Sequence, residues 1–372
     1  MEISSGAILM RQRALILCDK SAKTSFGRLA LSFRRALQEA FDARILWLAC
    51  PQDFPHGTQE ESDPVLWAKG RLLGRWSFPR GLHQMLHASS PDWVILIRPE
   101  LGFLVPFLRQ QTPKAKLSLM VHDTFAETLY PHSLKFRLIN HFWIQKCDHV
   151  DGFLFNSEWT HQEATKAFSL HGPQTICGCV VDPKDFYPLT QDAPSLKRKW
   201  EQDPERPVVL HLSLDEPRKN IPMVLSLARE FPQLQFVRIG QASPWIQQRM
   251  RTEGIGNVIH RKGLSLEELR EHYSMADVTL LPSFLEGFGY PALESLACGT
   301  PVIASNTSAM AEILPNISDL LDPMDLMTWK RALSARLHSG KSLSPLVSEQ
   351  LSRFSPQAFT DKILSHWNEL RR

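Results

Sequence analysis

The sequence predicts an α/β protein with two doubly wound domains, each a parallel sheet with helices on both faces. Three observations lead to this fold class. The chain has 372 residues, the length of about two domains. Short apolar runs alternate with amphipathic segments along the chain, as in parallel strands joined by helices. In the second half, one such run leads directly into a glycine-rich loop and a helix start.

The expected strands are short continuous apolar runs, because a parallel sheet is buried on both faces. In the first half we expect strands at Ala14–Cys18, Arg44–Leu48, Trp93–Ile97, Leu117–Val121 and Gly152–Phe155. In the second half we expect strands at Val208–Leu212, Leu234–Gly240, Asn257–His260, Asp277–Leu281 and Val302–Ala304. Helical sequence patterns predict helices over Leu29–Phe41, Leu266–Tyr273 and about 356–370.

The composition is that of a globular protein, with 43% hydrophobic and 22% charged residues. No apolar run approaches the roughly 18–20 residues that span a membrane, and the first residues lack the pattern of a signal peptide. The six cysteines are scattered, and Cys177 and Cys179 are too close together for a C-x-x-C metal site. We therefore expect a cytoplasmic protein whose cysteines are reduced and mostly buried.

The charge is unevenly distributed. Residues 1–170 hold 20 Lys+Arg against 16 Asp+Glu, net +4, and the remainder holds 22 against 23, net −1. A modestly basic half is compatible with a phosphate-bearing acceptor or peripheral contact with an anionic membrane surface, and equally with an ordinary solvated surface. No basic-aromatic pattern suggests a nucleic-acid partner.

The rest of the chain is organised around residues 283–301, which follow the expected strand Asp277–Leu281. Gly287 and Gly289 permit unusual backbone angles and close approach of a ligand to the main chain. Pro291 suits the first turn of a helix, and Gly299 and Pro301 suit its end. A strand, a glycine loop and a helix start together form an anion-binding arrangement.

Two carboxylates frame this loop. Glu286 precedes the glycines and Glu294 lies one turn into the helix, with seven residues between them. The alternative interpretation is a pair of surface carboxylates that are stabilised by the helix dipole.

This stretch resembles the E-x7-E signature of family 4 retaining glycosyltransferases. The resemblance includes the Glu-Gly-Phe-Gly segment at 286–289 and the Ala-Cys-Gly-Thr-Pro-Val segment at 297–302. It is strong over 207–304, looser before about residue 120, and closest in character to mannosyltransferases of surface polysaccharide synthesis. It implies the GT-B fold, in which two Rossmann-like domains face each other across a cleft.

The resemblance also implies a domain division. Residues 1–180 would form the N-terminal, acceptor-side domain, and 181–205 would form the linker, where 180–188 are similar to the family's crossing segment. Residues 206–355 would form the domain that binds the nucleotide sugar. Residues 356–372 would form a C-terminal helix that packs back on the first domain.

The resemblance assigns donor-binding roles to the stretch after the strand. Glu294 would accept hydrogen bonds from two ribose hydroxyls. Glu286 would hold sugar hydroxyls near the anomeric carbon as a catalytic residue. The main chain at Gly287, Phe288, Gly289 and Tyr290 would bind the sugar and the phosphates, with N–H groups offered by the last three.

A second group of charges lies in the loop after the expected strand Val208–Leu212. Lys219 matches the family lysine that binds the diphosphate, where fixed cations stabilise the leaving charge, so we assign it catalytic and donor-binding roles. The family usually has a Gly-Arg pair a few residues earlier, where this chain has Ser213-Leu214. Arg218 is the candidate substitute. The alternative for both side chains is an ordinary solvated position.

Two candidates lie in the first half. His122 follows the strand that ends at Val121, where the resemblance places a catalytic His near the sugar; the alternative is a structural histidine. Gly27 follows the first strand, and its segment resembles the family's donor-binding glycine loop, although that loop usually has two glycines. A plain turn before a helix is the alternative.

The implied function is transfer of a hexose, with retention, from a nucleotide diphosphate sugar to a hydroxyl of a glycan or lipid-linked acceptor. GDP-mannose is the slightly favoured donor, ahead of UDP-glucose and UDP-N-acetylglucosamine. No cofactor or metal is expected. The alternatives are a sugar-nucleotide epimerase or phosphorylase, or an inactive sugar-nucleotide-binding scaffold.

Overall fold

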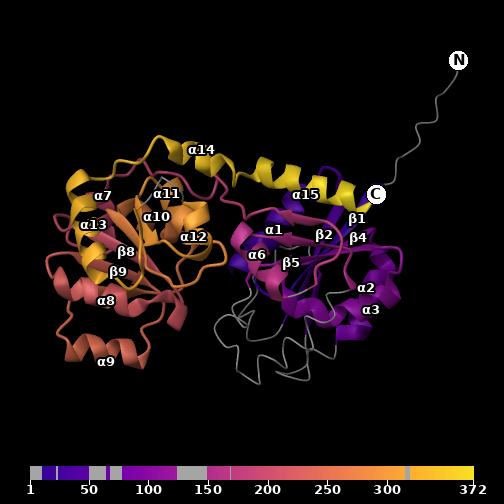
Figure 1. Ribbon diagram of the computed structural model, residues 1–372, viewed down its shortest axis with the longest axis horizontal. Coiled ribbons are helices and arrows are strands. Elements are labelled where there is room, and N and C mark those ends of the chain that lie inside the picture. Colours follow the sequence, from indigo (N-terminus) through magenta and orange to yellow (C-terminus); the bar gives the residue numbers. More distant parts are fainter. Residues whose placement is uncertain are drawn as a thin grey trace, which may run out of the picture. The chain divides into compact units, whose positions relative to one another are not determined.

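The computed structural model describes residues 11–21, 24–49, 64–67, 78–123, 149–167, 169–314 and 319–372. The chain divides into two units (Figure 1). Unit 1 comprises Met1–Asn156, Thr160–Gly178 and Pro356–Arg372, and unit 2 comprises Ser157–Trp159 and Cys179–Ser355. The chain therefore leaves unit 1 after Gly178 and returns to it at Pro356. The expected linker, 181–205, falls within unit 2, where it includes the helix α7 (Ala193–Lys199).

Unit 1 contains a parallel sheet of seven strands in the order β3-β2-β1-β4-β5-β6-β7. The strands are β1 (Gln12–Cys18), β2 (Phe41–Ala49), β3 (Val65–Trp67), β4 (Trp93–Leu96), β5 (Lys116–Val121), β6 (Gly152–Phe155) and β7 (Gln174–Ile176). The helices are α1 (Ser25–Leu37), α2 (Phe78–Ser89), η2 (Pro99–Leu104), α3 (Val105–Gln111), α6 (Glu158–Ala167, from Thr160 on) and α15 (Pro356–Leu370). From β1 the chain adds strands toward one edge of the sheet as far as β3, and from β4 it adds them toward the other edge.

Helices cover both faces of this sheet. Successive side chains of β1 point to opposite faces, so the strand has apolar side chains to bury on each side. Leu15 and Leu17 join a core cluster with Leu82 of α2 and Leu108 of α3. Helix α1, which packs on α15, covers β1 and β2. The doubly wound architecture expected for the first half is confirmed.

Unit 2 contains a parallel sheet of six strands in the order β10-β9-β8-β11-β12-β13. The strands are β8 (Val208–Leu212), β9 (Gln235–Ile239), β10 (Val258–Arg261), β11 (Val278–Leu281), β12 (Val302–Ser305) and β13 (Asp319–Leu321). The helices besides α7 are η4 (Pro217–Lys219), α8 (Ile221–Glu230), α9 (Pro244–Thr252), α10 (Leu266–Met275), α11 (Tyr290–Ala297), α12 (Ser308–Ile313), α13 (Leu326–Ser339) and α14 (Leu346–Ser352).

The second sheet is also covered on both faces. Val209, Phe236 and Val278 pack in one cluster with residues of α8 and with Trp329 of α13. On the opposite face the Thr279 hydroxyl lies 2.7 Å from that of Ser295 in α11. The strand order reverses at β8 and β11, and in such sheets ligands bind beyond the carboxyl ends of the strands at this point.

Helix α15 is an integral part of unit 1. The Phe33 ring of α1 meets Phe359 edge-on at 5.0 Å, and the Trp93 indole of β4 stacks on Trp367 at 5.0 Å. Such aromatic pairs each contribute about 0.5–1.5 kcal/mol beyond their buried area. The helix therefore closes one face of the first sheet (Figure 1).

Some sequence-based boundaries were wrong. Helix α1 begins at Ser25 and ends at Leu37 rather than spanning Leu29–Phe41. It begins earlier because the Thr24 hydroxyl caps its first turn. Phe41 instead opens β2, where it packs near Trp93. The edge strands β3, β7 and β13 were not predicted, because three residues are too few to show a pattern.

The cysteines that the structure describes, Cys18, Cys177, Cys179 and Cys298, are free and buried, as expected. Burial raises the pKa of the Cys18 and Cys298 thiols to about 12. Both thiols are therefore poor nucleophiles at neutral pH.

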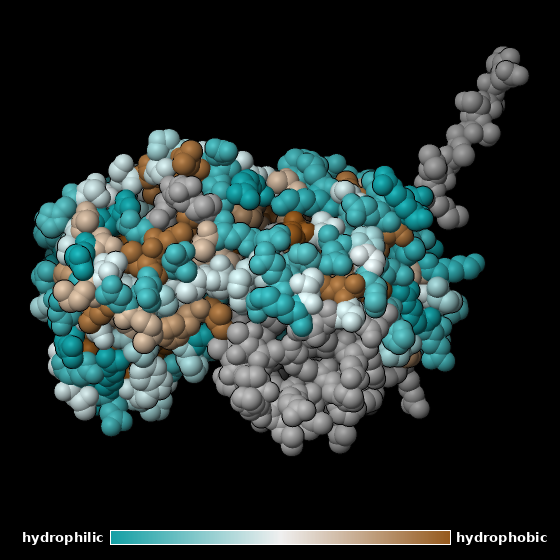
Figure 2. All heavy atoms as spheres, in the orientation of Figure 1, coloured by the Kyte–Doolittle hydropathy of each residue, from teal (hydrophilic) through white to brown (hydrophobic). Residues whose placement is uncertain are grey.

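The surface seen in Figure 2 is mostly polar, with apolar residues scattered in small groups. Within the described part of the chain, no helix is long and apolar enough to cross a membrane.

Buried histidines should make the protein sensitive to mild acid. Burial lowers the pKa of His122 and His211 to about 3 and that of His366 to about 4, against about 6.5 in an unfolded chain. Their contribution to stability is therefore complete above pH 6.5 and is lost as the pH falls toward 4. Each histidine should add about 1.4 kcal/mol per pH unit to the slope of unfolding free energy in that window.

Urea unfolding between pH 7 and pH 4.5 measures this slope. We expect His366→Gln to lower the slope of unfolding free energy against pH by about 1.4 kcal/mol per pH unit. The amide can keep partners at Ser118 and Thr175 without taking up a proton. The control is His171→Gln, at an exposed position. Equal slopes for wild type and His366→Gln would contradict the prediction.

Candidate active site

The stretch between β11 and α11 has the strand–loop–helix form that its sequence predicts. Gly289 has φ +98° and is the residue before the first turn of α11, with Pro291 in that turn. A Cβ atom at Gly289 would lie 2.5 Å from Sδ of Met310. Glycine is therefore needed here for both its backbone angle and its lack of a side chain.

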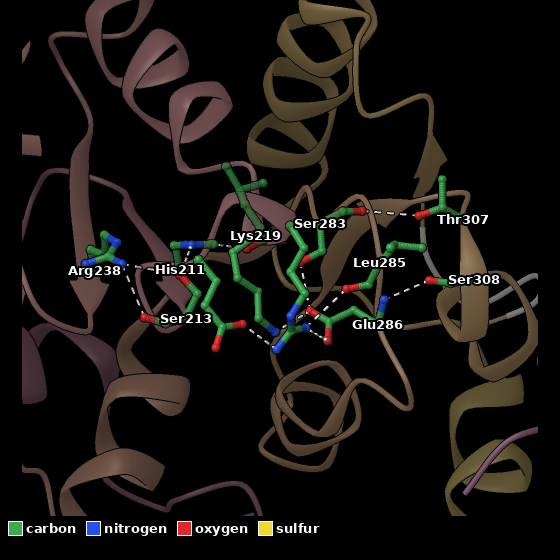
Figure 3. Close-up of polar contacts among 12 residues, drawn as sticks. His211, Ser213, Lys219, Arg238, Ser283, Leu285, Glu286, Thr307 and Ser308 are labelled. Carbon is green, nitrogen blue, oxygen red and sulfur yellow. Dashed lines mark hydrogen bonds and ion pairs between the residues drawn. The ribbon is translucent and has the colours of Figure 1, made fainter. Parts of the chain in front are cut away.

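Glu286 is buried, and its polar partners come from three segments of unit 2 (Figure 3). Its Oε1 atom lies 2.7 Å from Nζ of Lys219 and accepts a hydrogen bond of 2.7 Å from the Ser283 hydroxyl. Its Oε2 atom lies 3.4 Å from Nη1 of Arg218. Its main-chain N–H donates to the Ser308 hydroxyl at 2.9 Å.

The charge of Glu286 follows from this environment. Burial by itself raises the pKa of the carboxyl group, but Lys219 and Arg218 lower it, and the hydrogen bonds from Lys219 and Ser283 lower it further. The net shift is downward. Glu286 is therefore an ionised, oriented carboxylate at neutral pH, suited to accept hydrogen bonds rather than to act as a general acid.

Lys219 and Glu286 meet because β8 and β11 are neighbouring parallel strands. The loop after β8 carries η4, and the loop after β11 carries Glu286. The Phe284 N–H donates to the Arg218 carbonyl at 2.7 Å, and Nη1 of Arg218 donates to the Leu285 carbonyl at 3.2 Å. These contacts fix the two loops to each other, and Arg218 also pairs with Glu216 at 2.6 Å.

Glu294 is buried in α11 with 2% of its surface exposed. The Tyr273 hydroxyl donates to its Oε2 atom at 2.9 Å. This bond fixes the orientation of the carboxylate, since Tyr273 of α10 is itself fully buried. Sequence reasoning missed Tyr273, because nothing in the linear pattern links α10 to α11.

The other predicted donor-binding residues of this stretch lie at the amino end of α11. The Phe288 side chain is buried and contacts the rings of Tyr290 and Phe354 at 5.3 and 5.2 Å. Only the main chain of Phe288 is therefore suited to contact a ligand. Gly287 and Gly289 flank it in the sequence, and Tyr290 is the first residue of α11. The proposed ligand contacts of all four residues stay predictions.

His122 lies in unit 1, directly after β5, and is buried. Its Nε2 atom lies 2.6 Å from the Ile97 carbonyl, which can only accept, so this nitrogen carries the proton. Burial dominates the lowering of its pKa to about 3, and Arg98 lowers it further. His122 is thus a neutral imidazole at neutral pH, which limits it to hydrogen bonding rather than charge stabilisation.

Gly27 also lies in unit 1, within the first turn of α1 rather than in a loop before the helix. Its N–H donates to the Thr24 hydroxyl at 3.1 Å. The main-chain donor at Gly27 therefore has a partner within the chain, which favours the structural interpretation. Its donor-binding role stays a prediction.

An unpredicted ionic cluster adjoins His122. Arg98 pairs with Asp19 at 3.2 Å and with Glu100, and its guanidinium lies 4.6 Å from the centre of the Phe26 ring. Phe26 in turn meets His122 edge-on at 4.8 Å. Asp19 and Arg98 each follow a strand of unit 1. Charged residues at the ends of two neighbouring strands were the sequence feature that could have predicted this cluster.

Comparison with known proteins identifies the family. Residues 192–342 match the family model for glycosyl transferases group 1. The O-antigen chain mannosyltransferase B of Escherichia coli is 30% identical over 338 residues, covering 82% of this chain and 84% of that protein. The chain belongs to the glycosyl transferases group 1 family. The predicted resemblance to family 4 glycosyltransferases is confirmed, and the chain is a glycosyltransferase.

Other relatives match only in part. The MMP alpha-(1->4)-mannosyltransferase of Mycolicibacterium hassiacum is 36% identical over 97 residues, which is 25% of this chain and 24% of that protein. The solved sucrose-phosphate synthase from Thermosynechococcus elongatus has a TM-score of 0.82 at 18% identity, covering 97% of this chain and 99% of that one. This likeness confirms the GT-B fold.

No group of three or more His, Cys, Asp or Glu residues in the described ranges could hold a metal ion. The expectation that the reaction needs neither a metal nor a cofactor stays a prediction.

Replacing Gly289 by alanine should destabilise unit 2. The positive φ and the contact with the buried Met310 side chain should together cost about 1–3 kcal/mol. Gly254→Ala is the matched control, because Gly254 has φ +67° but nothing within 4 Å of its Cβ position. Denaturant unfolding should show the larger loss for Gly289→Ala, and equal losses would contradict the importance of the Met310 contact.

Proposed function

We propose that this glycosyltransferase moves a hexose, with retention, from a nucleotide diphosphate sugar to a hydroxyl of a glycan or lipid-linked acceptor. The observation that carries the proposal is the ionised Glu286 held by Lys219 and Ser283 beside the amino end of α11. A carboxylate that accepts hydrogen bonds suits sugar hydroxyls. Cations and a helix start suit the departing diphosphate.

The retaining outcome is proposed to come from a front-face reaction. The acceptor hydroxyl attacks the anomeric carbon on the side from which the diphosphate leaves, and the leaving phosphate oxygen takes the hydroxyl proton. The Glu286 carboxylate already contacts Lys219, Ser283 and Arg218. These contacts suit a role in positioning the sugar better than a role as covalent nucleophile. Lys219 stabilises the negative charge on the leaving oxygen, and neutral His122 is proposed to hydrogen bond the sugar.

Mannose from GDP-mannose is the favoured donor. The support comes from the two curated relatives described above, both named as mannosyltransferases. Neither name fixes the acceptor of this chain, so a glycan and a lipid-linked saccharide both stay within the proposal. A cytoplasmic location with peripheral membrane contact through the basic first half would suit the second of these.

The competing donors are UDP-glucose and UDP-N-acetylglucosamine, and the competing function is an inactive scaffold that binds sugar nucleotides. A thermal-shift panel with GDP, UDP, ADP and their sugar conjugates, with and without EDTA, separates these. A ligand at 100 times its dissociation constant stabilises the fold by about 2.7 kcal/mol.

We expect GDP and GDP-mannose to raise the melting temperature most, with no change on adding EDTA. A larger shift with UDP would reassign the base, and a loss of the shift in EDTA would contradict metal independence. No shift with any nucleotide would contradict the donor site itself. Binding of GDP-mannose without turnover on any acceptor would favour the scaffold.

Variants of the ion pair test the roles of its two members. Glu286→Ala should lower turnover about 10²–10³-fold while the protein stays folded, because it removes one preorganised transition-state contact. Lys219→Ala should weaken binding of both the donor and the free nucleoside diphosphate. The matched control is Lys184→Ala, at an exposed position of unit 2. Turnover of Glu286→Ala within threefold of wild type, or unchanged nucleotide affinity of Lys219→Ala, would contradict these roles.

A further inference from the structure

Arg238 of β9 is a fully buried arginine that lies outside the set of predicted site residues. Its Nη1 donates to the Gln241 carbonyl at 2.5 Å, and its Nη2 donates to the carbonyl and hydroxyl oxygens of Ser213 at 3.2 and 3.4 Å. Among the described residues, no carboxylate forms an ion pair with it. Burial lowers the pKa of Arg238, and the charge of Asp215 opposes this only in part. Burying a guanidinium with no carboxylate in contact is costly, so this arrangement needs an explanation.

The neighbours of Arg238 across the sheet are two histidines. It is in register with His211 of β8 on one side and with His260 of β10 on the other. The three side chains therefore form a row on the sheet face that α8 covers, two residues beyond the core positions Val209, Phe236 and Val258. The row lies at the carboxyl ends of the strands.

The hydrogen bonds through this row have a defined direction. Nδ1 of His211 lies 2.9 Å from the Leu280 carbonyl, which only accepts, so Nδ1 carries the ring proton. Nε2 of His211 must then accept from the Ser213 hydroxyl, 2.8 Å away. The Ser213 oxygen in turn accepts from Arg238. A series of hydrogen bonds, from Arg238 through Ser213 and His211 to the Leu280 carbonyl, thus connects β9, β8 and β11 (Figure 3).

This hydrogen-bond series joins β8 and β11, the two strands whose following loops carry Lys219 and Glu286. Ser213 is the first residue after β8, at the start of the segment that leads to Lys219. Leu280 lies near the end of β11, at the start of the segment that leads to Ser283 and Glu286. Gly240 permits the close approach, since a Cβ there would lie 2.2 Å from the Ser213 carbonyl oxygen.

The charges at the ion pair itself are already balanced. Lys219 and Arg218 supply two positive charges, and Glu286 and Glu216 supply two negative charges in contact with them. A diphosphate that bound here would bring at least two further negative charges. Arg238 is a nearby cation whose charge no carboxylate in the described ranges neutralises by contact.

We propose that Arg238 is a positioning residue of the donor site. It holds Ser213, and through Ser213 and His211 it sets the spacing of the loops that carry Lys219 and Glu286, while its charge favours an anion at the carboxyl ends of the strands. This inference rests on the proposed function, because it takes a nucleotide diphosphate as the ligand of that site.

The test measures nucleoside diphosphate affinity by calorimetry and melting temperature by circular dichroism. The variants are Arg238→Met, Ser213→Ala and Ser213→Thr. The matched control is Arg206→Met, because Arg206 also binds backbone carbonyls, those of Pro232, Gln233 and Leu234, but at the amino ends of the same strands. Ser213→Thr keeps the hydroxyl and serves as the conservative rescue.

We expect Arg238→Met to weaken GDP or UDP binding at least tenfold, since small misplacements of a binding group are costly. Ser213→Ala should weaken it about threefold or more, the cost of one hydrogen bond. Ser213→Thr should bind like wild type. Arg206→Met should lower the melting temperature without changing the affinity.

The two possible failures are distinguishable. A wild-type protein that binds no nucleoside diphosphate would contradict the proposed function. A wild type that binds, together with Ser213→Ala at wild-type affinity, or with Arg238→Met at the affinity of Arg206→Met, would overturn the role of Arg238 alone. The serine pair decides the question if Arg238→Met does not fold.

Discussion

The candidate site depends on one ion pair, that between Lys219 and Glu286, at a carboxylate with 9% of its residue surface exposed. A carboxylate this deeply buried stays ionised only because a cation and a hydroxyl lie in contact with it. The cation comes from the loop after β8 and the hydroxyl from the loop after β11. The geometry of the site is therefore inherited from the pairing of these two strands, where the order of the sheet reverses.

Much of this arrangement could be predicted from the sequence. Apolar runs located most of the central strands within a residue or two, because strands buried on both faces leave an unbroken apolar pattern. The exception is β2, which begins three residues before the expected Arg44. The glycines and proline around Glu286 predicted the loop and helix, since each is needed for a specific backbone position. The family resemblance then assigned Lys219, and the structure places it beside Glu286.

The rest could not be predicted because it depends on contacts between distant segments. Tyr273 contacts Glu294 only after α10 and α11 pack. The sequence of β9 gives no reason for a charged residue at position 238. The reason becomes visible only in the register of Arg238 with His211 and in its hydrogen bond to Ser213. The start of α1 was misplaced for a local reason, the hydroxyl cap of Thr24, which a periodicity argument does not weigh.

The return of the chain at Pro356 has a consequence for synthesis. Unit 1 begins the chain but its face over Phe33 and Trp93 is closed by α15, which is translated after all of unit 2. Domains generally fold as units while the ribosome is still adding residues. The aromatic side chains that α15 covers, Phe33 of α1 and Trp93 of β4, must therefore stay without this helix while more than 170 residues of unit 2 are made. During that interval the nascent chain is a natural client for chaperones that hold exposed apolar surface.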